Sequence, residues 1–202
     1  ADDWMWGAPV GLGGDPDFAY SGTKVWGNDL GGGNYNGTYQ SDKWNRLSSP
    51  AFDVSGYETV LLHFQRWLNV EDGYYDQSQV TANGAVVWSN HTSSQNIGDE
   101  HHEDVQWSPH TIVVPMNGES SVQFGWEIIS DQGLELGGWT IDDVCVYGIP
   151  QPEEETGSDS SIDGNDESIK AGGCSCSSTS STSHSWALAF GLLGLGLIRR
   201  RQ

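Results

Sequence analysis

Residues 79–88 read QVTANGAVVW, and this stretch decides the fold class. Two short runs flank Asn83 and Gly84, residue types that tolerate the positive φ angles of a type I′ turn. The pattern predicts a tight β-hairpin with strands over residues 79–82 and 85–88. It is the firmest local structure that the sequence predicts.

Further strands are predicted on both sides of the hairpin. Residues 59–68 and 122–128 alternate apolar and polar side chains, as half-buried strands do. Residues 111–114 are β-branched and stop at a proline, and residues 139–147 form a last strand. Helical periodicity is absent from this part of the chain. We therefore predict an all-β fold, a jelly-roll-like antiparallel β-sandwich over residues 1–149.

The composition changes after this domain. The sequence QPEEETGSDSSIDGNDES has seven acids and no base, which predicts a disordered acidic linker over residues 150–171. Residues 172–202 combine two cysteines, a serine-rich spacer, an apolar run and three arginines. This order is typical of a C-terminal sorting or anchor segment.

The apolar run predicts a C-terminal hydrophobic helix. Residues 186–198 form a run of 13 uncharged residues, and a bilayer core needs roughly 20. The serines before the run extend the uncharged stretch, so a helix could span a thinned bilayer. A plain tail anchor and a buried core helix are the alternatives. The residues expected at the membrane are Trp186, Leu192, Leu193 and Ile198, followed by Arg199, Arg200 and Arg201 on the cytoplasmic side.

The tail resembles the MYXO-CTERM sorting domain of bacterial surface proteins. Gly173, Cys174 and Cys176 stand in the place of the short Gly/Cys motif of that family. The resemblance implies export to the outer cell surface, cleavage near the cysteine by a C-terminal sorting protease, and lipid attachment there. The usual motif is Cys-Gly-Cys, whereas this chain has Ser175 in the middle.

Charge limits the class of partner. The chain carries 28 Asp and Glu against 8 Lys and Arg, a net charge of −20. Residues 1–150 hold 4 basic and 21 acidic residues, which gives 4 − 21 = −17. This field repels phosphate backbones and excludes nucleic acid as a partner, while it attracts cations such as calcium. Because residue 1 is not Met, we expect either a mature form or a C-terminal piece of a longer protein.

Two groups of acids predict a structural Ca²⁺ site. Strict alternation in the last strand would place Asp143 on the same face as Trp139, where an unpaired carboxylate is costly. Either a bulge at Asp142 and Asp143 switches the faces, or a cation satisfies the carboxylate. Glu71 and Asp76 lie in the loop after residues 59–68 and could supply further oxygens. The alternative is that all four acids are solvated loop residues.

The order of motifs resembles the MAM-like jelly-roll domains found C-terminal to immune inhibitor A-type metalloproteases. The matching stretches include WMWGAP, AYSGTKVWG, LSSPAFDVSG, FQRWLNVEDGYYDQSQV and SDQGLELGGWTIDDVCV. The resemblance implies a jelly-roll sandwich, structural calcium and a non-catalytic accessory or adhesive role. By motif, Asp76 matches the Tyr-Asp at the entry of the central strand in that family, and Asp142 and Asp143 match its terminal Ile-Asp-Asp. Its usual DGG-x-W turn is replaced here by Asn83 and Gly84.

Other residue types have simpler interpretations. Residues 99–104 read DEHHED, which is not HExxH, so we expect a polar loop there. With three cysteines in the chain, Cys145 is expected to be a buried free thiol. Nine of ten tryptophans precede residue 150. Trp67, Trp126 and Trp139 are expected in or near the core, whereas Trp44, Trp88 and Trp107 border loops and are predicted ligand contacts.

Together these features predict a non-enzymatic extracellular recognition or adhesion module, with a surface glycan or a protein as ligand. The processed tail would display it on the bacterial cell surface, with the C-terminal segment in the membrane before processing. No catalytic residues are predicted. The alternatives are an accessory domain of a secreted protease whose catalytic domain lies upstream, and a carbohydrate-binding module.

Overall fold

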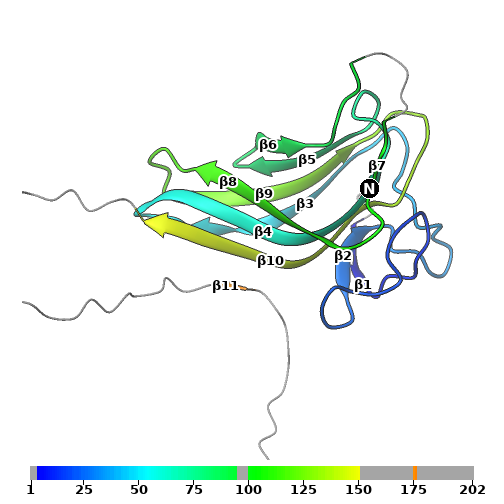
Figure 1. Ribbon diagram of the computed structural model, residues 1–202, viewed down its shortest axis with the longest axis horizontal. Helices are drawn as coiled ribbons and strands as arrows, with labels where there is room; N and C mark the ends of the chain where they lie inside the picture. The colour runs from blue at the N-terminus through cyan, green and yellow to red at the C-terminus, as the bar shows by residue number, and fades with distance from the viewer. Residues whose placement is uncertain (1–3, 95–99, 151–174, 177–202) are drawn as a thin grey trace, which may run out of the picture.

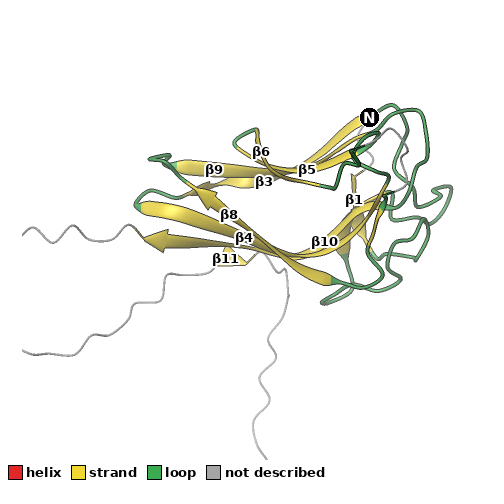
Figure 2. Cartoon of the chain, turned by 45° about the horizontal axis from the view of Figure 1, so that its top comes forward, coloured by secondary structure: helices red, strands yellow, loops and turns green. Residues whose placement is uncertain are grey.

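Two antiparallel β-sheets pack face to face in the computed structural model, which describes residues 4–94, 100–150 and 175–176 (Figures 1 and 2). The fold is the predicted jelly-roll-like β-sandwich. The strands of the described residues are β1 (Trp4–Gly7), β2 (Val25–Asn28), β3 (Trp44–Asp53), β4 (Tyr57–Val70), β5 (Gln77–Ala82), β6 (Ala85–Ser89), β7 (His102–Glu103), β8 (Ser108–Pro115), β9 (Ser121–Ile129), β10 (Gly138–Pro150) and β11 (Ser175–Cys176).

The larger sheet has the order β1-β2-β10-β4-β7, with β8 also paired to β4 and β11 to β10. The smaller sheet has the order β3-β9-β5-β6. The two long strands β4 and β10 form the middle of the larger sheet, although more than 60 residues separate them in the chain. Figures 1 and 2 show that many of the long loops gather at the end of the sandwich where β1 and β2 lie.

The predicted hairpin is confirmed. Strands β5 and β6 pair with Ala82 opposite Ala85. Asn83 has φ 49° and Gly84 has φ 81°, the two positive angles that a type I′ turn requires.

The core lies between the sheets and contains the apolar side chains that alternate with polar ones along the predicted strands. On β4, Val60, Leu62, Phe64 and Leu68 are fully buried, and the alternating residues of β9 face them. The Trp139 ring lies 6.2 Å from that of Phe64, and its indole N–H donates to the Glu127 carbonyl at 3.0 Å. Trp126 and Trp139 are therefore core residues, as predicted.

Trp67 was expected in or near the core, and it lies half-buried on the outer face of the larger sheet, near the core but not in it. It is adjacent to the fully buried Leu68 on β4, and successive side chains of a strand point to opposite faces. Loops from distant parts of the chain contact its ring and leave it half-buried. The residues that cover the Trp67 ring lie far from it in the sequence, so the residues next to Trp67 did not indicate these contacts.

A bulge interrupts β10 at the acidic pair, which was one of the two predicted solutions. The pairing of β10 with β4 shifts register between Asp142 and Cys145. Asp143 has φ 46° and is exposed, so its carboxylate avoids the core.

Cys145 is disulfide-bonded, which corrects the expectation of a free thiol. The pairing of β10 with β11 places Cys176 opposite it. This strand pairing joins segments about 30 residues apart, on either side of the acidic stretch. The spacing of the cysteines alone did not indicate it.

The predicted linker apart from Pro150, which ends β10, lies outside the described residues. So do the processing residues Gly173 and Cys174 and the predicted membrane residues from Trp186 onward. Within residues 4–94, 100–150 and 175–176, no helix is long and apolar enough to cross a membrane.

Candidate functional site

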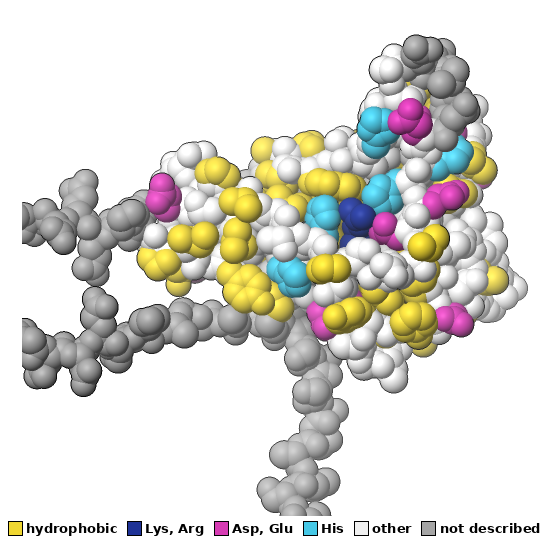
Figure 3. Space-filling model, in the orientation of Figure 1, with side chains coloured by type: hydrophobic (Ala, Val, Ile, Leu, Met, Phe, Trp, Pro, Cys, Tyr) yellow, Lys and Arg dark blue, Asp and Glu magenta, His cyan; other side chains and the backbone are white. Residues whose placement is uncertain are grey.

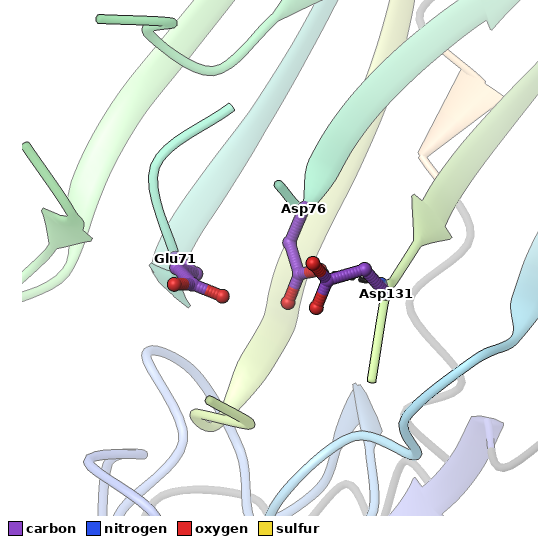
Figure 4. Close-up of side chains that lie close together, drawn as sticks. All are labelled: Glu71, Asp76 and Asp131. Atoms are coloured by element: carbon purple, nitrogen blue, oxygen red, sulfur yellow. Dashed lines mark hydrogen bonds between the residues drawn. The ribbon is translucent and has the colours of Figure 1, made fainter. Parts of the chain in front are cut away.

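Three carboxylates meet where strands of both sheets end. Glu71 directly follows β4, Asp76 directly precedes β5, and Asp131 follows shortly after β9. One ligand atom from each lies within 4.8 Å of the others, and the side chains converge in Figure 4. Three carboxylate oxygens at this spacing supply part of the ligand set that a hard cation needs.

The three carboxylates differ in their hydrogen bonds. Asp76 accepts from the Tyr39 hydroxyl at 2.6 Å and from the Asp131 backbone N–H at 2.8 Å. Asp131 accepts from the Gly133 N–H at 2.6 Å. Glu71 is only 8% exposed, yet its Oε2 atom has no hydrogen-bond partner. A buried carboxylate oxygen without a donor is costly unless a cation or a proton satisfies it.

Electrostatics at the cluster is unfavourable for three bare anions. Burial raises the pKa of Glu71, and the nearby Asp76 and Asp131 carboxylates raise it further. Burial also raises the pKa of Asp76, although the hydrogen bond from Tyr39 opposes that shift. No ion pair found in the described residues joins any of the three to a basic side chain. A bound divalent cation would remove this repulsion.

The structure brings together two of the four predicted calcium ligands. Asp142 and Asp143 lie apart from the cluster on the β10 bulge, where they hold the loop around Ser21. The Ser21 N–H donates to Asp142 at 2.9 Å, and the Ser21 hydroxyl donates to Asp143 at 2.6 Å. Sequence reasoning missed Asp131, although its position just after a predicted strand placed it at a sheet end.

The neighbouring Asp72 has a different role. It is fully buried and accepts the N–H groups of Ser93 and Tyr74, each at 2.9 Å. Burial acts to raise the pKa of Asp72, but these hydrogen bonds outweigh it and lower the pKa to about 2. His101 Nδ1 accepts the Asp72 N–H at 3.2 Å. Asp72 therefore ties the loop that precedes β5 to the loop that follows β6.

A second polar group lies at the side of the sandwich where β4 and β8 face β6. Arg66 makes two hydrogen bonds to Asp104, at 2.9 and 3.2 Å, and His102 contacts the same carboxylate at 3.1 Å. Histidine side chains gather around a basic side chain in Figure 3. Burial and the Arg66 charge lower the pKa of His110 to about 4. The opposite charges of Arg66 and Asp104 offset each other between the two sheets, and we call this group of side chains the seam.

The three tryptophans predicted to contact ligand have different surroundings. Trp44 is 63% exposed on the smaller sheet, and its indole N–H donates to Glu127 at 2.8 Å. Trp88 packs against Trp139 with 5.5 Å between ring centroids, and the Arg66 guanidinium lies 5.5 Å from its ring. Its ring therefore contacts the protein's own side chains. Trp107 belongs to an aromatic group on the outer face of the larger sheet.

We call this group the aromatic surface; it consists of Phe18, Tyr20, Trp67 and Trp107. Edge-to-face contacts join the rings, with centroid distances of 6.0 Å for Trp67–Trp107, 6.4 Å for Phe18–Trp67 and 6.3 Å for Tyr20–Trp107. Phe18 is 57% and Tyr20 51% exposed. The Trp67 indole N–H donates to the Gly14 carbonyl at 2.9 Å, and that of Trp107 donates to the Phe18 carbonyl at 3.1 Å. These bonds fix both indole rings.

A groove of about 480 Å³ adjoins the aromatic surface, and Trp67 forms part of its wall. Asn69 and Glu103 add polar groups to the lining, and Val105 and Leu136 add apolar ones. The Asn69 amide donates to the Gly14 carbonyl at 2.7 Å. This bond holds the loop that contains Gly13 and Gly14, which we call the glycine loop, against β4. A larger hollow of about 620 Å³ lies beside Tyr35, and its lining is mostly polar loop. Both hollows combine aromatic and polar groups, as small-molecule sites do, and the groove differs in having a tryptophan ring held by its own hydrogen bond in the wall.

Comparisons with known proteins give one sequence relative and several similar structures. No family model matches the chain. Over 146 residues the chain is 26% identical to Bacillopeptidase F from Bacillus subtilis (strain 168). The match covers 72% of this chain but 9% of the relative's length, so this chain corresponds to a small part of that protein.

Two solved structures illustrate the fold similarity. One is the C-terminal CBM6 of LamC, a marine laminarinase from Zobellia galactanivorans, with a TM-score of 0.40, 15% identity, and coverage of 72% of this chain and 88% of that chain. The other is the K1 cleaved adhesin domain of Lys-gingipain from Porphyromonas gingivalis W83, with a TM-score of 0.36 and 15% identity. The match covers 69% of this chain and 82% of that chain. Likeness at this level carries no argument about ligand or activity.

Proposed function

We propose that this chain is a non-catalytic extracellular recognition module that binds a neutral carbohydrate chain at the aromatic surface. One observation carries the proposal. Two tryptophan rings, Trp67 and Trp107, are fixed by their own N–H bonds beside a groove with polar groups. Rigid aromatic side chains next to a few convergent polar groups are the usual make-up of a binding site.

Carbohydrate fits this combination of groups. A sugar ring has an apolar C–H face that packs on an aromatic ring, and hydroxyls that hydrogen-bond a carboxylate such as that of the exposed Glu103. The charge of −17 on residues 1–150, from 4 basic and 21 acidic residues, opposes binding of a polyanion. A neutral chain is therefore the ligand class that the surface favours.

Native affinity gels test the proposal with the full chain and soluble β-glucan, xylan and mannan as probes. We expect one of these polymers to retard the protein, and Trp107→Ala to weaken that binding about tenfold or more, because truncating a central interface tryptophan costs roughly 2 kcal/mol. Trp44→Ala is the matched control, since Trp44 is 63% exposed on the other sheet.

Two results would contradict the proposal. Unchanged mobility in all three polymers would remove carbohydrate as the ligand class. Loss of binding in Trp44→Ala with normal binding in Trp107→Ala would move the ligand to the smaller sheet.

A second candidate function is an accessory domain of a secreted protease. Its support is the sequence similarity to part of Bacillopeptidase F. Immunoblotting of the source cells with an antiserum against this chain would test it. A polypeptide much larger than 202 residues that copurifies with protease activity would favour the accessory role. A product of about this length without protease activity would oppose it.

Surface display remains a proposal that rests on the order of elements in the tail and on the MYXO-CTERM resemblance. We also propose that the sandwich is a MAM-like domain, and the order of its motifs supports this. We expect Cys174→Ala to leave unprocessed protein in the cell envelope. Normal surface labelling of that variant would contradict the sorting role of the tail.

A further inference from the structure

We propose that Glu71, Asp76 and Asp131 form a Ca²⁺ site that holds one wall of the groove, so that ligand binding there depends on calcium. The dependence on calcium rests on the proposed carbohydrate function, whereas the cation site stands on its own geometry. Figure 4 shows the three side chains converging from separate segments.

The first step is the need for a cation. Glu71 Oε2 is buried without a hydrogen-bond donor, and two further carboxylates lie within 4.8 Å. An uncompensated buried charge costs several kcal/mol, so the native state gains when a cation completes the group. The hydrogen bonds that Asp76 and Asp131 accept leave further lone pairs on their oxygens.

The second step is the identity of the cation. All three side chains offer carboxylate oxygen, and no histidine or cysteine belongs to the group. The nearby His101 uses its Nδ1 atom to accept the Asp72 N–H. Hard oxygens from three different segments, completed by carbonyls or water, suit Ca²⁺ with its six to eight flexible ligands better than Zn²⁺ or Cu²⁺.

The third step is the connection to the groove. Glu71 is two residues beyond Asn69, whose side chain lines the groove. Asp131 begins the segment 131–137, and Leu136 of that segment lines the groove from another side. Two of the three ligands, Glu71 and Asp131, therefore belong to chain segments that also form parts of the groove wall.

Tyr39 links the segment to the cluster. Its hydroxyl donates to Asp76 at 2.6 Å and lies 3.2 Å from the Leu134 carbonyl, while its backbone N–H donates to the Leu136 carbonyl at 3.0 Å. The segment 131–137 has no strand pairing, and its first four residues are exposed. Such segments open at low cost, so the cation would supply much of their order. A cation and a ligand that favour the same closed state strengthen each other's binding.

Calorimetry and hydrogen exchange on the full chain test the proposal. We expect Ca²⁺ to bind at this site and to slow amide exchange in residues 131–137 at least tenfold, and we expect EDTA to weaken polysaccharide retardation at least tenfold. Glu71→Gln should abolish both calcium effects. It should still fold, with a melting temperature in EDTA no lower than that of the wild type, because it removes a repulsive charge.

Asp143→Asn is the matched control. It removes a carboxylate from the other acidic pair, and Asn tolerates the positive φ at that position. We expect it to bind Ca²⁺ like the wild type. Loss of Ca²⁺ binding in Asp143→Asn but not in Glu71→Gln would overturn the site.

The remaining outcomes separate the two proposals. No Ca²⁺ binding, or unchanged exchange in residues 131–137, overturns this inference. Polysaccharide retardation that is equal in Ca²⁺ and in EDTA also overturns it, and leaves the carbohydrate function intact. No retardation under any condition contradicts the carbohydrate function, and the calorimetry and exchange results then still decide the cation site and its effect on the segment.

Discussion

Replacing Asp15 by Asn should make the protein more stable at neutral and alkaline pH. Asp15 is 7% exposed, its Oδ2 atom has no hydrogen-bond partner, and its Oδ1 atom accepts a hydrogen bond of 3.3 Å from Thr140. Burial raises the pKa of Asp15 from 3.8 to about 9, and the Asp29 charge adds to the increase while the Thr140 bond opposes it. The folded protein therefore keeps this carboxyl protonated at neutral pH.

The sign and size of the effect follow from linkage. Above pH 3.8 the unfolded chain releases the Asp15 proton while the folded chain retains it, so stability falls as pH rises until the folded pKa near 9 is passed. The slope is about 1.4 kcal/mol per pH unit, so between pH 5 and pH 8 this one group should cost up to about 4 kcal/mol. Asn mimics the neutral form at every pH and removes that loss.

The assay is urea unfolding of the wild type and Asp15→Asn at pH 5 and pH 8, in EDTA. Other titrating groups are common to both proteins, so they cancel in the difference. We expect the stability advantage of the variant to grow by several kcal/mol from pH 5 to pH 8. Parallel pH profiles would refute the reasoning, because they would mean that Asp15 has the same proton occupancy in both states.

Two further substitutions test the seam and the glycine loop. Asp104→Ala should cost about 3 to 5 kcal/mol, because it leaves the Arg66 guanidinium, 12% exposed, without its partner; the exposed Glu119→Ala should stay within about 0.5 kcal/mol in the same urea assay. Equal costs for the two would contradict the structural role of the pair. Gly13→Ala should cost more than about 2 kcal/mol, because Gly13 has φ 66° and an added Cβ would lie 1.9 Å from the Gly37 carbonyl oxygen. A variant with unchanged stability would show that the loop adopts another conformation.

The parts of the fold that sequence predicts well are those that local chemistry determines. Asn83 and Gly84 specify their turn without help from the rest of the chain, and the apolar parity of β4 and β9 shows which face is buried. The bulge in β10 was one of two predicted solutions because burying Asp143 beside Trp139 would be costly.

What sequence did not predict depends on segments that meet only in the folded chain. Trp67 was expected in or near the core, and the sequence did not show that β4 turns it outward, where Phe18 and Trp107 from two distant loops form a surface with it. Asp131 joins Glu71 and Asp76 because β9 pairs with β5 and ends beside it. The backbone pairing of Cys145 with Cys176 also depends on a segment beyond the acidic stretch. None of these contacts leaves a local signal in spacing or periodicity.

The central claim, that the aromatic surface is the recognition site, is tested most directly by NMR of the tryptophan indole N–H signals. The full chain would be titrated in Ca²⁺ with the neutral polysaccharide that retards it in native gels. We expect shifts of the Trp67 and Trp107 indole signals, while those of Trp44 and the buried Trp126 and Trp139 stay in place. Shifts of the Trp44 signal, with Trp67 and Trp107 unchanged, would contradict the central claim.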